Sequence, residues 1–147
     1  MIKDTIERVL TLKAPIERVY KAVSDKNELC KWFPDRIEGQ IKAGEDSTWH
    51  FDECGSCRVH VVGGDPYGYF AFRWVPGASG TTMEDVLSVP NTLVEFRLEE
   101  EGDGTRLTML ESGFSSLPPE VYESALRENN AGWDSELAEL VKFVEQA

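Results

Sequence analysis

Residues 93–114 read LVEFRLEEEGDGTRLTMLESGF, and this stretch decides the fold class. Apolar and polar residues alternate on both sides of Glu101–Gly104, which is the period of a β-strand with one buried face. Glycine and aspartate in that turn tolerate the positive φ angles of a tight hairpin. The stretch therefore predicts two antiparallel strands. Their shared apolar face would carry Val94, Phe96, Leu98, Leu107 and Met109.

The same two-residue period recurs from Arg36 to about Gly113. Its runs are separated by Gly, Asp, Pro and Asn, and they read RIEGQIK (36–42), STWHFDE (47–53), CRVHVVG (57–63), GYFAFRWV (68–75), TLVEFRLEE (92–100) and TRLTMLESGF (105–114). Five or six strands at such short spacing predict an antiparallel meander. Residues 77–91 show no clear period, and they could form a short strand inside a long loop or a mobile cover over a binding site.

Helical periods flank this meander. Residues 5–12 alternate like a further strand and end at Pro15, which suits the first position of a helix through Val23. Asp25, three residues before Glu28, has the spacing of a helix N-cap pair and predicts a second short helix that Pro34 stops.

The C-terminal segment after SSLPPE has an apolar stripe at helical spacing, made of Trp133, Leu137, Leu140, Val141 and Val144. Asn129, Asn130 and Gly132 are poor helix formers and could mark a kink or a break there. The order of elements predicts an α+β fold, in which a curved antiparallel β-sheet wraps around one long C-terminal helix. Such an arrangement often leaves a cavity between helix and sheet.

Length and charge exclude several classes of protein. A chain of 147 residues is expected to form one domain, residues 1–147, with a core that needs no disulfide or metal. The net charge of −12 repels phosphates and anionic lipids, so no nucleic acid and no membrane is expected as a partner. The first residues contain no continuous apolar run, so no signal peptide or transmembrane span is expected. Three cysteines fit a reducing compartment, and the expected location is cytoplasmic.

The stretch HFDECGSCRVH, residues 50–60, holds both histidines and two of the cysteines. The apolar pattern favours a hairpin in which Glu53 pairs with Cys57, which places His50 directly opposite His60 on the polar face. The thiols and imidazoles would then not converge on one tetrahedral zinc ion. We therefore expect no metal centre and no redox pair, and keep His50 and His60 only as weak candidates for a surface metal site.

Aromatic and aliphatic side chains on the inner face are the candidate walls of a ligand cavity. They are Trp32, Trp49, Phe51, Val59, Phe70, Phe72, Trp74, Phe96, Met109, Trp133 and Leu137. For any one of them, filling an ordinary core is the commoner role. Arg73 alternates outward between Phe72 and Trp74 and is expected at the surface.

Glu111 is the weak catalytic candidate. It continues the inward parity of Leu107 and Met109, where its carboxyl would be desolvated, as suits a general acid or a polar anchor. The commoner alternative is that this strand end is already open to solvent. The sequence has no Gly-x-Ser-x-Gly motif and no glycine-rich phosphate loop, and no cofactor is expected.

Four stretches together resemble the family named for the activator of heat-shock-protein-90 ATPase, within the START-like helix-grip superfamily. They are LKAPIERVYKAVSDKNELCKWF (12–33), FRWVPG (72–77), LVEFRLEEEGDGTRLTMLESGF (93–114) and AGWDSELAEL (131–140). The resemblance implies the helix-grip fold in its single-domain form. The stretch 77–91 looks longer, and the 50–60 hairpin richer in cysteine, than is usual in that family.

The resemblance implies three functions. The first is a small-molecule binding protein that holds an apolar or aromatic ligand between sheet and C-terminal helix. The second is a cyclase-like or hydrolase-like enzyme that uses the same cavity, and the third is an interaction protein that contacts a chaperone. A binding protein is preferred over an enzyme, because no nucleophile constellation is visible in the sequence.

Overall fold

The computed structural model describes residues 4–52, 55–76 and 85–146. Within these residues, seven strands form one antiparallel sheet in the order β1-β7-β6-β5-β4-β3-β2. The strands are β1 (Thr5–Leu12), β2 (Arg36–Glu38), β3 (Asp46–Phe51), β4 (Gly55–Asp65), β5 (Tyr69–Trp74), β6 (Thr92–Glu101) and β7 (Gly104–Ser112). The helices are α1 (Ile16–Ser24), α2 (Lys26–Leu29) and α3 (Pro119–Glu145), with short 3-10 turns η2 (Val86–Ser88) and η3 (Phe114–Ser116). The predicted α+β fold, with its meander and its long C-terminal helix, is confirmed.

The hairpin that decided the fold class forms as the alternation predicted. Glu101 pairs with Gly104 across the turn, and Gly102 has the positive φ of 60° that the turn needs. The inward residues of both strands are buried, including Phe96 opposite Met109. β2 is much shorter than the RIEGQIK run suggested, because Gly39 takes a positive φ of 101° directly after Glu38 and the strand ends there.

The two short helices begin where their sequence signals stand. α1 starts directly after Pro15 and buries Val19 and Val23 against the sheet. The Asp25 carboxylate accepts a hydrogen bond from the backbone N–H of Glu28 at 3.1 Å, so it caps α2.

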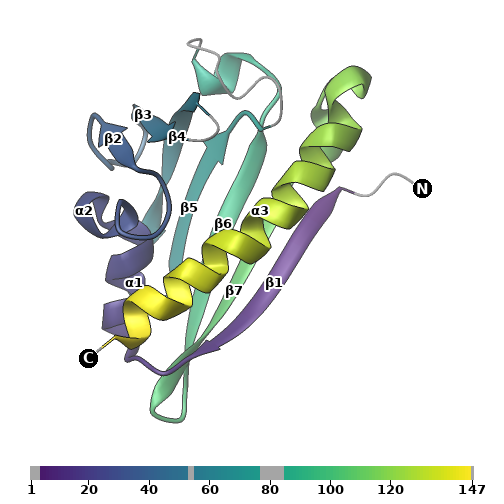
Figure 1. Ribbon diagram of the computed structural model, residues 1–147. Coiled ribbons are helices and arrows are strands. Elements are labelled where there is room, and N and C mark those ends of the chain that lie inside the picture. Colours follow the sequence, from purple (N-terminus) through teal and green to yellow (C-terminus); the bar gives the residue numbers. More distant parts are fainter. Residues whose placement is uncertain (1–3, 53–54, 77–84, 147) are drawn as a thin grey trace.

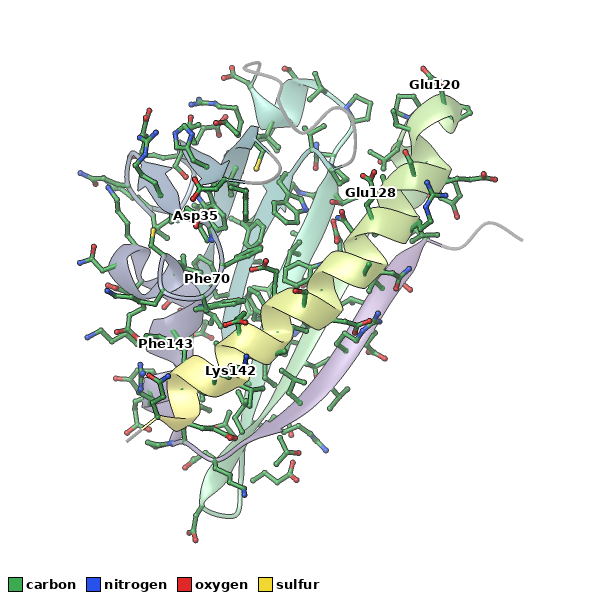
Figure 2. The ribbon with its side chains drawn as sticks, viewed as in Figure 1. Asp35, Phe70, Glu120, Glu128, Lys142 and Phe143 are labelled. Atoms are coloured by element: carbon green, nitrogen blue, oxygen red, sulfur yellow. The ribbon has the colours of Figure 1, made fainter. Side chains whose placement is uncertain are left out.

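α3 lies diagonally across one face of the sheet, with α1 and α2 beside the β2–β3 edge (Figure 1). Its apolar stripe is buried against the strands and includes Trp133, Leu137, Leu140 and Val144. The core therefore sits between α3 and the inner face of the sheet. Figure 2 shows Phe70 on the α1 side of the sheet and Glu128 on the upper half of α3.

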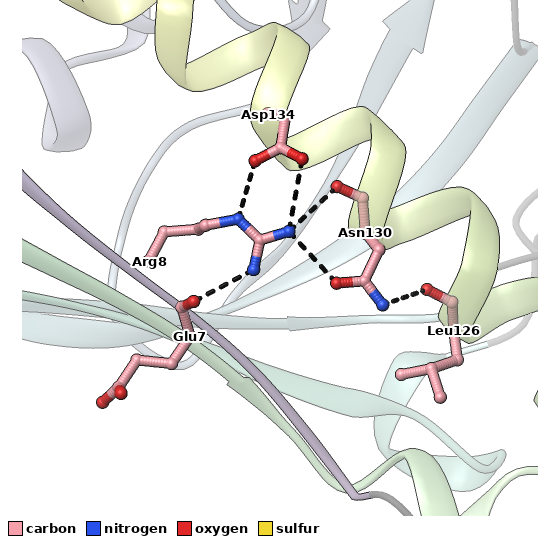
Figure 3. A network of polar contacts seen from close by, with 5 residues as sticks. All are labelled: Glu7, Arg8, Leu126, Asn130 and Asp134. Atoms are coloured by element: carbon pink, nitrogen blue, oxygen red, sulfur yellow. Dashed lines mark hydrogen bonds and ion pairs between the residues drawn. The ribbon is translucent and has the colours of Figure 1, made fainter.

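A polar clamp ties α3 to the edge strand β1. Arg8 donates to both carboxylate oxygens of Asp134, at 2.7 and 3.4 Å, and to the backbone and side-chain oxygens of Asn130 (Figure 3). The hydrogen bond from Arg8 holds the pKa of Asp134 below its usual range. These contacts attach the middle of α3 to the β1 edge of the sheet.

The segment that could have been a strand or a cover is only partly described, because residues 77–84 lie outside the described ranges. From Asp85 onward the chain forms η2 rather than a strand, with Val86 buried. None of the described helices is both long enough and apolar enough to cross a membrane.

Candidate functional site

A cavity of about 220 Å³ lies between the middle of α3 and the ends of β3, β4 and β5. The sheet and the segment before β2 supply one side of its lining, and α3 supplies the other. The lining residues are Phe33, Phe51, Gly55, Ser56, Cys57, Trp74, Val75, Pro76, Glu128, Asn129, Gly132, Trp133 and Glu136.

Four aromatic rings make up the apolar wall. Phe33 is central, with its ring centroid 5.4 Å from that of Phe51, 5.7 Å from Trp74 and 5.3 Å from Trp133. The Trp74 and Trp133 rings are 6.0 Å apart. These separations are in the range in which aromatic side chains attract one another, so each ring helps to hold the others in place.

The Glu111 carboxylate lies directly behind this wall and is fully buried. Trp133 Nε1 donates to Oε1 at 2.8 Å, while Trp74 Nε1 and Thr92 Oγ1 donate to Oε2 at 2.8 and 2.6 Å. Asn129 Nδ2 lies within 3.1 Å of both oxygens. The alternative that this strand end is open to solvent is therefore wrong. The alternation that Glu111 shares with Leu107 and Met109 predicted its inward position correctly.

Four side chains hydrogen-bond to the Glu111 carboxyl group, namely those of Trp74, Thr92, Asn129 and Trp133. Glu111 consequently fixes two of the four cavity rings, those of Trp74 and Trp133, through their indole N–H groups.

The poor helix formers in α3 are explained by the cavity. The helix continues from Pro119 to Glu145, so the alternative of a break at residues 129–132 is wrong. Asn129 uses its side chain to bind Glu111, and Gly132 lines the cavity. A Cβ added at Gly132 would meet no atom within 4 Å, which shows that the missing side chain leaves open space.

Only part of the predicted cavity wall lines the cavity. Phe51, Trp74 and Trp133 do so. The remaining candidates are buried in the core instead: Trp32, Trp49, Val59, Phe70, Phe72, Phe96, Met109 and Leu137. Buried side chains such as Leu140 and Val144 pack under the C-terminal end of α3, whereas the cavity lies at the middle of the helix, at residues 128–136.

Several lining residues were not anticipated. Phe33 follows Trp32 in the WF pair of the N-terminal stretch. Its position against the rings of four sheet residues, Trp49, Phe51, Phe72 and Trp74, depends on tertiary contacts. Glu128, Gly132 and Glu136 share one helical face because they are spaced by four residues. This spacing in the sequence could have predicted a helix face on which two glutamates flank a position without a side chain.

The histidine hairpin has the predicted faces but not the predicted register. Trp49 pairs with Cys57, and His50 with Ser56, so His50 and His60 are not opposite one another. His50 Nδ1 lies 2.5 Å from Ser56 Oγ, and His60 Nδ1 lies 2.7 Å from Asp46 Oδ1. Glu53 and Cys54 lie outside the described residues. In the described part of the chain, no three His, Cys, Asp or Glu side chains are grouped to hold a metal ion.

The family comparison agrees with this fold. The model of the family described as Activator of Hsp90 ATPase homolog 1-like protein matches residues 13–145. The chain belongs to this family. A comparison with curated proteins gives no match.

Several solved structures have the same fold. DynU16, a protein of the dynemicin biosynthetic locus, is 21% identical to this chain, with a TM-score of 0.76. The match covers 99% of this chain and 48% of the DynU16 chain. CalU16 from Micromonospora echinospora is 25% identical, with a TM-score of 0.71 and coverage of 96% and 76%. The Aha1 dimer from Colwellia psychrerythraea is 21% identical, with a TM-score of 0.75 and coverage of 99% and 97%. This chain thus spans about half the length of DynU16.

Proposed function

We propose that this chain, acting as a single domain, binds a small apolar or aromatic ligand in the cavity between α3 and the ends of β3, β4 and β5. The observation that carries the proposal is that four aromatic rings surround one cavity where α3 has glycine in place of a side chain. Apolar, aromatic walls with a few placed polar groups are typical of small-molecule sites.

The size of the cavity limits the ligand. At about 220 Å³ it is smaller than the roughly 300–1,000 Å³ usual for drug-sized ligands. A single aromatic ring with a short substituent is therefore the expected size of the bound group.

The contacts of Glu111 favour binding over catalysis. Its carboxylate is enclosed behind the wall and already accepts hydrogen bonds from four side chains. A general acid or base must reach the proton that it transfers, and Glu111 does not line the cavity as described. The cyclase-like or hydrolase-like alternative therefore has little support from this site, and contact with a chaperone is supported by the family description alone. We place the binding activity in the cytoplasm on the basis of the cysteine usage.

The test is binding of 2-phenylethanol, measured by saturation-transfer difference NMR with the wild-type chain and two leucine variants. Gly132→Leu would fill the cavity from α3, whereas Ala131→Leu adds the same side chain at the neighbouring exposed position. Wild type and Ala131→Leu should saturate the probe, and Gly132→Leu should not, with all three giving the same far-UV circular dichroism. Equal saturation by folded Gly132→Leu would overturn the proposal.

A further inference from the structure

The charged residues of the cavity all have the same sign. Glu128 and Glu136 lie one helical turn before and one after Gly132, and both line the cavity. The described lining residues include no Lys, Arg or His. Within the described ranges, no basic side chain makes an ion pair with Glu128, since the α3 pairs are those of Asp134 and Glu139.

The side-chain N–H donors of the described wall are already used. The indole N–H groups of Trp74 and Trp133 and the amide of Asn129 all point at Glu111. A ligand carboxylate or phosphate would therefore meet ring faces and carboxylates instead of these hydrogen-bond donors. Entry of an anion into such a site costs desolvation energy that these nitrogen donors do not offset.

The same features attract a cation. The faces of Trp, Tyr and Phe rings bind ammonium groups that lie within about 6 Å of the ring centre. Here each of the rings of Phe33, Phe51, Trp74 and Trp133 lies within 5.3 to 6.4 Å of at least two of the others. The net charge of −12 also favours the approach of cations.

We propose that the ligand class of this cavity is a small organic cation, an aromatic or arylalkyl amine whose ring packs among Phe33, Phe51, Trp74 and Trp133 and whose ammonium group faces Glu128 and Glu136. This inference rests on the proposed function and specifies its ligand. Gly132 provides the gap between the two carboxylates through which the ammonium group reaches them.

Three probes with one shared aromatic body test the inference: 2-phenylethylammonium, 2-phenylethanol and phenylacetate, which are positive, neutral and negative at pH 7. Their dissociation constants are measured by NMR titration at low and at moderate salt. The cation should bind at least about threefold more tightly than the alcohol, with phenylacetate weakest. Added salt should weaken the binding of the cation and leave that of the alcohol nearly unchanged.

The double variant Glu128→Gln, Glu136→Gln separates charge from shape. It should weaken binding of the cation by roughly three- to tenfold and leave the alcohol unaffected. Glu123→Gln, Glu139→Gln, a pair of exposed carboxylates on the same helix, is the matched control and should change neither affinity.

The possible failures are distinguishable. If the alcohol binds as tightly as the cation and Gly132→Leu abolishes both, the cavity binds ligands but the inference of a cationic ligand is wrong. If phenylacetate binds most tightly, the inference is likewise overturned. If none of the probes binds the wild-type chain, the proposed function and the inference fall together.

Discussion

Replacing Gly132 with alanine should make the protein more stable and the cavity less able to bind. Glycine inside a helix is destabilising by roughly 0.5–1 kcal/mol relative to alanine. At Gly132 the new Cβ meets no atom within 4 Å, so no clash offsets this gain. The free energy of unfolding should therefore rise by about 0.5–1 kcal/mol. The new methyl group would project into the cavity and weaken the binding of 2-phenylethylammonium.

The assay is urea denaturation followed by circular dichroism, with an NMR titration of the ligand on the same samples. Ala131→Gly, the reverse substitution at the exposed neighbouring position, is the control. Its free energy of unfolding should fall by about as much as that of Gly132→Ala rises. The double variant Ala131→Gly, Gly132→Ala should then have nearly wild-type stability and still bind weakly. A loss of stability in Gly132→Ala, or unchanged binding in the double variant, would refute the reasoning.

Two further predictions concern the polar groups. Glu111→Gln replaces an acceptor oxygen with a donor among four converging donors, which leaves at least one of them buried and unpaired. The free energy of unfolding, measured by urea denaturation, should therefore fall by roughly 2–4 kcal/mol. A decrease of less than about 0.5 kcal/mol would contradict the assigned hydrogen bonds. On the outer face, burial and the hydrogen bond to Glu95 raise the pKa of Tyr69 to about 12. Because this folded-state pKa lies above that of an unfolded tyrosine, the stabilisation is complete below about pH 10 and is lost as pH rises toward 12. The melting temperature of Tyr69→Phe should therefore fall less than that of the wild type between about pH 10 and pH 12. The variant should also lack the absorbance increase at 295 nm that one ionising tyrosine gives near pH 12. An identical alkaline profile in the variant would show that the pKa of Tyr69 is not raised.

The faces of the strands could be predicted from the sequence, but the register of the histidine hairpin could not. A slip of one strand past the other by four residues, an even number, keeps every side chain on its face. The apolar pattern is therefore satisfied equally by the predicted pairing of Glu53 with Cys57 and by the observed pairing of Trp49 with Cys57. The choice between them depends on the turn and on contacts such as that of His60 with Asp46. The prediction of an opposed histidine pair failed for this reason.

The location of the cavity was also beyond the sequence pattern. Phe72, Phe96 and Trp133 all face inward, yet only Trp133 lines the cavity. Which inward residues meet α3 and which meet open space depends on how the helix crosses the sheet, which the Arg8 clamp helps to fix. The signal that was present lay in α3 itself. Asn129 and Gly132 contradict helix propensity, and such local conflicts are expected at functional sites.

The most direct measurement is an NMR titration that follows the indole N–H signals of the four tryptophans as 2-phenylethylammonium and 2-phenylethanol are added. The indoles of Trp74 and Trp133 line the cavity, whereas Trp32 and Trp49 are held in the core by hydrogen bonds to the Ala22 carbonyl and to Ser47 Oγ. The account predicts that the Trp74 and Trp133 signals shift in a saturable way, while those of Trp32 and Trp49 stay in place. Saturable shifts confined to Trp32 and Trp49, or no shift of any indole signal with either probe, would contradict a binding site in this cavity.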